Sequence, residues 1–393
     1  MFAWYNWLAG GDDMEKILKG YVFRLYPTKE QLILIEKSIG CSRFIYNYFL
    51  NISKEEKINA YNYIKKLPEL INEYIWLKEV DSCLLRTSIF NLDNAYQKYF
   101  KETKGLPKFK SKTRSRQSYR TNNITRSYKG KTYNSIELDL NKKIIKLPKL
   151  KEVSIKGYRN LKQINGKIIN ATIYKEVNRY YVSICVEEYI IPPIVIPKTI
   201  IGIDLGIKNL VITSDGKVYN NQKYITKYEK KIKGLQKWLS RSQKGSKNRE
   251  KIKLKLTRVY QKLKNARKYL IHQISKEITE ENDIIVAEKL KISQMVKNSH
   301  FSKQIYDASW QKLIRCISYK SKWKNKKFYQ IDTSYPSSQI CSHCGFKNKE
   351  LKKLNIRNWE CPKCQSENER DINASINIMN EGLRKYMDEL QFN

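Results

Sequence analysis

The sequence contains no run of 18 apolar residues, so no membrane-spanning helix and no membrane partner are expected. Its first residues, MFAWYNWLAGG, lack the basic segment and the long apolar run of a signal peptide. Met14 begins a more conventional start, and residues 1–13 are interpreted as an N-terminal extension. The absence of both signals argues against a secreted protein and against one that spans a membrane.

Acidic residues are scarce in this chain. Asp and Glu total 38 against 77 Lys and Arg, which gives a net charge of +39 over 393 residues. Such an excess repels itself in the folded protein unless a polyanion neutralises it, and this charge indicates nucleic acid. A solvated basic surface, as in ribosome-associated proteins, is the alternative, and charge alone does not distinguish DNA from RNA.

The eight cysteines do not form an evident disulfide framework. Four of them make two CxxC pairs, Cys341 with Cys344 and Cys361 with Cys364, separated by 16 residues. Two such pairs place four thiolates around one ion, which predicts a structural zinc ribbon. His343, inside the first pair, is an alternative ligand. The other four cysteines are predicted to be buried thiols, which favours a reducing, cytoplasmic compartment.

Periodicity divides the first half of the chain into strand-like and helical segments. Residues 20–28 alternate as a strand, 29–104 follow a helical period, and 130–190 return to strand-like alternation. This order predicts a small β-barrel split by a helical domain. The basic, polar residues 106–130 are predicted to be a loop-rich segment, and the prolines between 192 and 197 to be a linker.

A second unit begins at residue 199 with apolar strands. Two helices are predicted between 227 and 280, and a short buried strand at 283–290. A helix around 303–324 and a strand near 327–332 precede the cysteine pairs.

Three acidic residues lie at the ends of apolar elements in the second unit. Asp204 follows IIGI, Glu288 ends IIVAE, and Asp371 opens the predicted final helix. Asp371 could be only a helix N-cap, whereas Asp204 between apolar neighbours is costly to desolvate without a cation. Carboxylates are preferred Mg²⁺ ligands, and phosphodiester hydrolysis by two Mg²⁺ ions needs such ligands. The three acids therefore predict a two-ion nuclease site in a ribonuclease-H-like layout.

The order of motifs resembles that of the TnpB family, the transposon-associated RNA-guided nucleases related to type V CRISPR effectors. The similarity is carried by GIDLGIKNL, VAEKL, SYPSSQICSHCG, WECPKC and RDINASINI, and in the front half by GYVFRLYPT, CSRFIYN, LPKFKSK, QSYRTNN and LSRSQKGSKN. The match spans roughly residues 20–380. The chain departs from the family at Gln365, where Gly is frequent, and at Asn368-Glu369, where a His-Asp pair is common.

The resemblance implies a multidomain α+β fold. A wedge β-barrel domain is split by an inserted helical recognition domain, and a RuvC-like, ribonuclease-H-like nuclease domain carries an inserted zinc ribbon. The expected boundaries are 14–28 and 105–195 for the wedge domain, 29–104 for the recognition domain, 198–335 and 367–393 for the nuclease domain, and 336–366 for the ribbon.

The resemblance also implies an RNA-guided DNA endonuclease of a transposable element, which acts with its guide RNA on double-stranded DNA. A monomer with its RNA is expected, and a dimer is the alternative that the sequence leaves open. Asp204, Glu288 and Asp371 would bind two Mg²⁺ ions, Arg370 would contact phosphate, and Zn²⁺ would be structural. The alternatives are a compact type V CRISPR effector, a guide-free transposase of the same fold, and an RNA-guided DNA-binding repressor. The presence of all three acids argues against the repressor.

Family members cut beside a short DNA motif, and side chains that pair with base edges are expected to read it. The segment QSYRTNN and a helix face near Leu85, where relatives often carry glutamines, supply such side chains. A phosphate grip without base preference is the alternative for this segment. The candidate readers are Tyr46, Arg86, Thr87, Gln117, Ser118, Tyr119, Arg120, Thr121 and Asn122.

Overall fold

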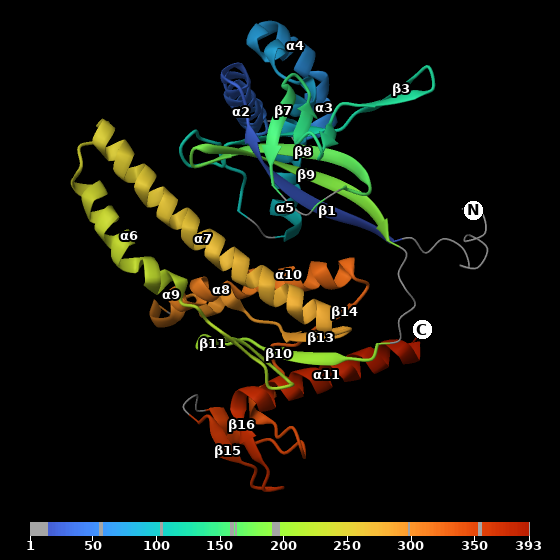
Figure 1. Ribbon diagram of the computed structural model, residues 1–393, viewed down its shortest axis with the longest axis vertical. Helices are drawn as coiled ribbons and strands as arrows, with labels where there is room; N and C mark the ends of the chain where they lie inside the picture. Colours follow the sequence, from blue (N-terminus) through green and yellow to red (C-terminus); the bar gives the residue numbers. More distant parts are fainter. Residues whose placement is uncertain are drawn as a thin grey trace. The chain divides into compact units, whose positions relative to one another are not determined.

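The protein divides into two compact units, with the division after Ile191. Figure 1 shows the computed structural model. The expected extension at 1–13 and the linker prolines 192 and 193 lie outside the described residues. Among the helices in the described ranges, none combines the length and apolar character that a bilayer crossing needs. The structure describes residues 15–54, 58–102, 105–157, 161, 163–190, 197–297, 299–352 and 356–392.

The first unit is built on a seven-stranded antiparallel sheet with strand order β2-β8-β9-β1-β7-β6-β5. The long central strands bury alternate side chains, as in β9, where Val182, Ile184 and Val186 are fully buried. A separate hairpin joins β3 to β4. The strands are β1 (Glu15–Tyr26), β2 (Ser118–Asn122), β3 (Thr125–Tyr128), β4 (Lys131–Asn134), β5 (Glu137–Asp139), β6 (Ile144–Leu147), β7 (Lys151–Lys156), β8 (Lys167–Glu176) and β9 (Arg179–Ile190).

This sheet is open, which corrects the predicted β-barrel. No ladder joins the edge strands β2 and β5 within the described part of the unit. Residues that follow β2 bond to residues that precede β5: Asn123 accepts from the Ile136 amide (2.9 Å), and the Ser135 amide donates to the Ile124 carbonyl (3.0 Å). Asn123 also donates from Nδ2 to the Ile168 carbonyl of β8 (3.0 Å). These bonds lie at the base of the separate β3–β4 hairpin, which stands between β2 and β5 in the sequence, and no pairing extends along the two edge strands.

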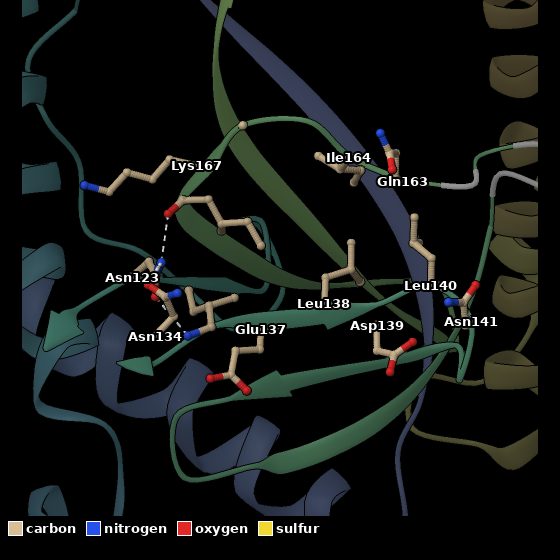
Figure 2. A pocket seen from close by; sticks show the side chains of 13 residues that line it. Asn123, Asn134, Glu137, Leu138, Asp139, Leu140, Asn141, Gln163, Ile164 and Lys167 are labelled. Atoms are coloured by element: carbon tan, nitrogen blue, oxygen red, sulfur yellow. Dashed lines mark hydrogen bonds between the residues drawn. The ribbon is translucent and has the colours of Figure 1, made fainter. Parts of the chain in front are cut away.

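A cavity of about 570 Å³ opens beside this incomplete closure. Figure 2 shows Asn123 and Asn134 next to each other at one end of it, and the Asn123 Nδ2 atom donates to Asn134 Oδ1 at 3.2 Å. Side-chain amides therefore satisfy edge groups that strand pairing leaves open.

Four α-helices lie between β1 and β2 in the sequence (Figure 1). Thr28 begins the first with a capping box, in which its side chain accepts from the Gln31 amide (3.3 Å) and its amide donates to Gln31 Oε1 (3.0 Å). The apolar faces of these helices share one core with the sheet. They are α2 (Lys29–Ile52), α3 (Ala60–Lys65), α4 (Leu67–Glu73) and α5 (Ser82–Glu102), with a 3₁₀ turn η1 (Ile75–Glu79) before α5.

The prediction of a loop-rich segment at 106–130 is wrong for its second half. Residues 118–122 form β2 and 125–128 form β3. Of the residues of β2, Tyr119 and Thr121 point into the core. Two buried positions make an alternation of buried and exposed residues that is too short for the sequence to distinguish a strand from a polar loop.

The second unit contains a five-stranded sheet with order β12-β11-β10-β13-β14. Strands β10, β13 and β14 are parallel, whereas β11 runs antiparallel to β10 and to β12. Figure 1 shows α7 and α10 over one face of this sheet and α11 along the other. The strands are β10 (Ile200–Asp204), β11 (Asn209–Thr213), β12 (Val218–Asn220), β13 (Ile284–Glu288) and β14 (Lys327–Ile331).

The helices of this unit follow the predicted order with one further break. The predicted helix at 303–324 is two helices, because Ser309 adopts a left-handed conformation with φ +54° between them. Short 3₁₀ turns η2 (Ser337–Gln339) and η3 (Lys349–Lys352) precede the hairpin of β15 (Asn358–Glu360) and β16 (Glu367–Glu369). The helices are α6 (Tyr224–Arg241), α7 (Lys247–Glu281), α8 (Ile292–Met295), α9 (Ser299–Ala308), α10 (Trp310–Trp323) and α11 (Arg370–Phe392).

Two glycines let α11 lie directly on the sheet. A Cβ atom at Gly202 of β10 would lie 2.0 Å from the Ser375 carbonyl oxygen, and one at Gly382 of α11 would lie 2.2 Å from a methyl carbon of Val286. Both distances are far inside van der Waals contact. The backbones of α11, β10 and β13 therefore approach as closely as they do only because these positions lack side chains.

We expect Gly202→Ala to lower the free energy of unfolding of the second unit by about 1–3 kcal/mol, because the added methyl must displace α11. The matched control is Gly234→Ala in α6, where an added Cβ meets nothing within 4 Å. That change should be neutral or stabilise by about 0.5–1 kcal/mol. Urea unfolding of the two variants measures both effects, and equal midpoints would contradict the close approach.

Candidate active site and metal centre

Asp204 and Glu288 lie side by side at the ends of two parallel strands. Ile203 of β10 pairs with Ala287 of β13, so the next residue of each strand is an acid. Ile203 and Ala287 face the core under α7 and α10. Since side chains alternate along a strand, Asp204 and Glu288 face the opposite side, which α11 covers.

Asp371 enters the same cavity from the first turn of α11. The cavity has a volume of about 420 Å³, and Asp204, Glu288, Arg357 and Arg370 also line it. A site outside the carboxyl ends of parallel strands is where open α/β sheets commonly bind ligands. The structure thus brings together all four residues that the sequence proposed for this site, and adds Arg357.

Burial and neighbouring charges raise the proton affinity of the acid at the end of β10. Burial, together with the charges of Glu288 and Asp371, raises the pKa of Asp204 to about 7, while Arg370 acts in the opposite direction. Burial also raises the pKa of Glu288. Carboxylates crowded in a buried site with raised pKa values are stabilised by a bound cation, so the donor set fits a hard metal ion such as Mg²⁺.

Arg357, which precedes β15, holds the carboxylate of Asp371. Its Nη1 atom donates to Asp371 Oδ1 at 2.8 Å and to Oδ2 at 3.0 Å, and its carbonyl accepts from the Arg370 amide at 2.7 Å. Because α11 begins at Arg370, Asp371 lies inside the first turn, and its carboxylate pairs with an arginine. No pattern in the sequence indicates this contact, since Arg357 is one of many basic residues in the chain.

Arg370 is buried beside the acids, with 6 % of its surface exposed. Its Nη2 atom donates to Ser338 Oγ at 3.5 Å. Burial lowers the pKa of its guanidinium, as does the nearby charge of Arg357, whereas Asp371 and Asp204 act against this effect. The cavity therefore combines two guanidinium groups with three carboxyl groups.

The four predicted zinc ligands form one cluster. Their sulfur atoms all lie within 4.8 Å of one another, with Cys341 Sγ 3.8 Å from Cys364 Sγ and Cys344 Sγ 3.6 Å from Cys361 Sγ. Zinc–sulfur bonds of about 2.3 Å in a tetrahedron place sulfurs about 3.8 Å apart. The cluster therefore fits Zn²⁺, and it does so without His343.

Each cysteine pair closes a similar turn, and each turn contains a residue in the left-handed conformation. In the first turn the Gly345 amide donates to the Cys341 carbonyl (2.9 Å), and Gly345 has φ +73°. In the second turn the Gln365 amide donates to the Cys361 carbonyl (2.8 Å), and Gln365 has φ +58°. The departure from the family's glycine therefore puts a side chain where a left-handed residue is strained.

Two asparagines attach the ribbon to α11. Asn373 donates from Nδ2 to the Ile340 carbonyl (2.7 Å) and accepts from the Ser342 amide (2.8 Å). Asn377, one turn later, also donates to the Ile340 carbonyl (2.7 Å). Both asparagines are buried, so water cannot replace a lost bond. Losing either bond would leave a buried donor or acceptor without a partner. These bonds fix the first cysteine turn relative to the helix that carries Asp371.

The predicted motif readers, all in the first unit, are buried, exposed or partly exposed. Thr121 is 1 % exposed and its hydroxyl donates to Asp81, and Thr87 donates to the Cys83 carbonyl within α5. Their side chains cannot contact a base, which corrects the sequence-based proposal. The cause is that a strand and a helix each bury one face, and this face was not evident from the polar composition. The buried candidates are Tyr46, Thr87, Tyr119 and Thr121.

Three other candidates remain exposed on neighbouring elements. Arg120 and Asn122 lie on the outer face of β2, and Arg86 lies on α5. The two elements are in contact, as the Asn122 amide donates to Cys83 Sγ at 3.3 Å. Ser118 and Gln117 are partly exposed, but the Gln117 amide is bound to the Ser111 and Ser115 carbonyls.

We expect Gln365→Gly to strengthen the ribbon by about 1 kcal/mol, because glycine adopts φ +58° without steric cost. The matched control is Gly345→Gln, which places the same strain in the first turn and should weaken the ribbon by a similar amount. Zinc release to a competing chelator measures both changes. Slower zinc release from Gly345→Gln than from Gln365→Gly would contradict the proposal that the left-handed conformation strains Gln365.

Three family models match parts of this chain. The model described as "Probable transposase" matches residues 183–299. The model described as "Cas12f1-like, TNB domain" matches residues 310–378, which include the four cysteines. A "Helix-turn-helix domain" model of the same transposase family matches residues 14–57.

Full-length relatives align with almost the whole chain. A "Putative RNA-guided DNA endonuclease" of Streptomyces pristinaespiralis is 30% identical and covers 94% of this chain and 90% of its own. The "Putative RNA-guided DNA endonuclease InsQ" of Escherichia coli (strain K12) is 28% identical and covers 93% of each. Among solved structures, "Cryo-EM structure of the Cas12f1-sgRNA-target DNA complex" aligns with 93% of this chain and 99% of its own, at 17% identity and a TM-score of 0.37. With relatives of this similarity along its length and its motifs in the family's order, the chain belongs to the TnpB family.

Proposed function

We propose that this protein is an RNA-guided DNA endonuclease of a transposable element. The names of the full-length relatives support guidance by RNA and cleavage of DNA. The observation that carries the chemistry is that Asp204, Glu288 and Asp371 line one cavity together with two arginines. Metal-dependent hydrolysis of a phosphodiester at this cavity is the reaction that such a donor set serves.

Asp204, Glu288 and Asp371 would hold two Mg²⁺ ions. When bound, these ions supply an activated water and stabilise the leaving oxygen. All three side chains line one cavity of about 420 Å³, where such ions would lie.

The two arginines would bind the phosphate. Guanidinium groups form paired hydrogen bonds with phosphate oxygens, and both Arg357 and Arg370 border the cavity. Arg357 is half exposed, with 57% of its side chain accessible, so it can reach a nucleic acid while its carbonyl stays bound to the Arg370 amide. Through Arg357, the zinc ribbon would contribute to the active site as well as to stability.

The rest of the chain would hold the guide RNA and its DNA target. The net charge of +39 suits a duplex held by its backbone without sequence preference. We assign α2 to α5 to the recognition domain, the open sheet around β1 to the wedge domain, the sheet around β10 with α11 to a RuvC-like nuclease domain, and β15 and β16 to the ribbon. Arg86, Arg120 and Asn122 remain as readers of the adjacent DNA motif.

Replacing any one acid by its amide should abolish cleavage and leave RNA-guided DNA binding intact. Asp204→Asn, Glu288→Gln and Asp371→Asn each remove a charged metal ligand, so the loss should exceed the roughly 10- to 100-fold cost of losing an outer-shell partner. Asp388→Asn is the control, since Asp388 is also on α11 but pairs with Arg384 at the surface. Cleavage at the normal rate by any of the three variants would remove that residue from the site.

Arg120→Ala and Asn122→Ala should change which flanking DNA motif is preferred, by about 1–3 kcal/mol for each base contact that is lost. Arg126→Ala on β3 is the control, because Arg126 is exposed but is not a candidate reader. A cleavage assay on a library of flanking sequences measures the preference. If the variants lose activity equally on every sequence and regain it at low salt, the segment only grips phosphates.

A further inference from the structure

A second and larger cavity adjoins the acidic one within the same unit. Its volume is about 890 Å³, and its walls come from the loop after β10, the first turn of α6 and α9. The two cavities share Ile207, Lys208 and Arg357. A strand bound at the acids would therefore reach the second cavity by passing over this shared wall.

The lining of this cavity is mainly apolar. Ile207, Ile225 and Ile305 come from three different elements and meet in it. Ile207 and Ile225 keep part of their surface exposed, although each has an apolar side chain. A concave apolar surface with a few polar groups around it is the usual form of a site for a flat organic group.

The rim of the cavity is basic. Lys208, Lys223 and Lys303 lie around it, together with Arg357 on the wall that faces the acids. Lys303 pairs with Glu229 at 2.6 Å, whereas Lys208 and Lys223 are exposed. Apolar surface for a base beside cations for the phosphates is what a single-stranded nucleic acid requires.

The walls are held in place by hydrogen bonds that do not depend on a ligand. The buried Asp307 accepts from the Ile225 amide at 3.2 Å and from Arg267 Nε at 2.7 Å. Asn221 donates from Nδ2 to the Ile207 carbonyl at 2.9 Å. Arg267 neutralises the one acid that lines the cavity, so this carboxylate does not repel a polyanion. The cavity is therefore preformed.

We propose that this cavity is a base subsite. It receives the base of a nucleotide next to the scissile phosphate, while that phosphate lies at the acids. The inference rests on the proposed nuclease function and adds a requirement to it. A base in a duplex is stacked and paired, so it enters such a cavity either from an unpaired strand or by leaving its stack and its partner. The nucleotide next to the cut must therefore be unpaired when the strand is cleaved.

An abasic scan tests the subsite with the wild-type protein. The guide-RNA complex is given a target whose cleaved strand carries a single abasic site, moved one nucleotide at a time across the cut. Cleavage should slow at one or two positions beside the cut, by about 5-fold or more, which corresponds to the loss of one base contact. Equal rates at every position would overturn the proposal.

A filled cavity gives an independent test. Thr226 is exposed and lines the cavity, so Thr226→Trp places a ring where the base would lie. This variant should cleave the intact strand more slowly and lose the dependence on the abasic position. The matched control is Ser240→Trp, at an exposed site at the other end of α6. This variant should keep the wild-type cleavage rate and the dependence on the abasic position. A Thr226→Trp protein with the wild-type rate and profile would overturn the proposal.

A binding readout separates failure of the subsite from failure of the proposed function. In the Asp371→Asn complex, 2-aminopurine at the sensitive position should gain fluorescence on binding, because it leaves its stacked neighbours. Thr226→Trp should abolish this gain, and an unchanged signal would contradict the subsite. A wild-type complex that cleaves no DNA at all, yet shows the fluorescence gain, would refute the nuclease function and keep the base site.

Discussion

The close packing of α11 on β10 and β13 is the contact on which the candidate active site depends. Gly202 and Gly382 remove the side chains that would hold the helix away. The helix then presents Asp371 from its first turn to the strand ends that carry Asp204 and Glu288. A methyl group at either glycine would push the helix away and separate Asp371 from the other two acids. The two glycines therefore set the geometry of the three acidic side chains.

The same helix also carries the ribbon. Asn373 and Asn377 bind the carbonyl of Ile340, beside the first cysteine turn. The ribbon in turn returns a side chain to the site, since Arg357 pairs with Asp371. A hairpin of this size has too small a core to fold without its ion. We infer that zinc stabilises the ribbon and, through it, the position of one guanidinium beside the acids.

Sequence reasoning singled out the acids that line one cavity and the cysteines that form one cluster, because both are encoded locally. A carboxylate that ends an apolar strand is visible as a pattern, and the CxxC spacing is itself the geometry of a metal turn. The predicted barrel was wrong, because whether two edge strands pair depends on how they approach in the folded unit, and β2 and β5 share no ladder in the described residues. Four of the nine proposed motif readers proved to be buried, because β2 and the helices α2 and α5 each turn one face into the core.

The sequence by itself determined the order of the elements, the four sulfur ligands, the three acids and the excess of positive charge. Each of these follows from residue type and from short-range spacing along the chain. The tertiary structure alone decided that Arg357 meets Asp371, that the sheet of the first unit stays open, and that an apolar cavity lies beside the acids. These features join residues from elements far apart in the sequence, and their contacts depend on packing distances that a linear pattern does not record.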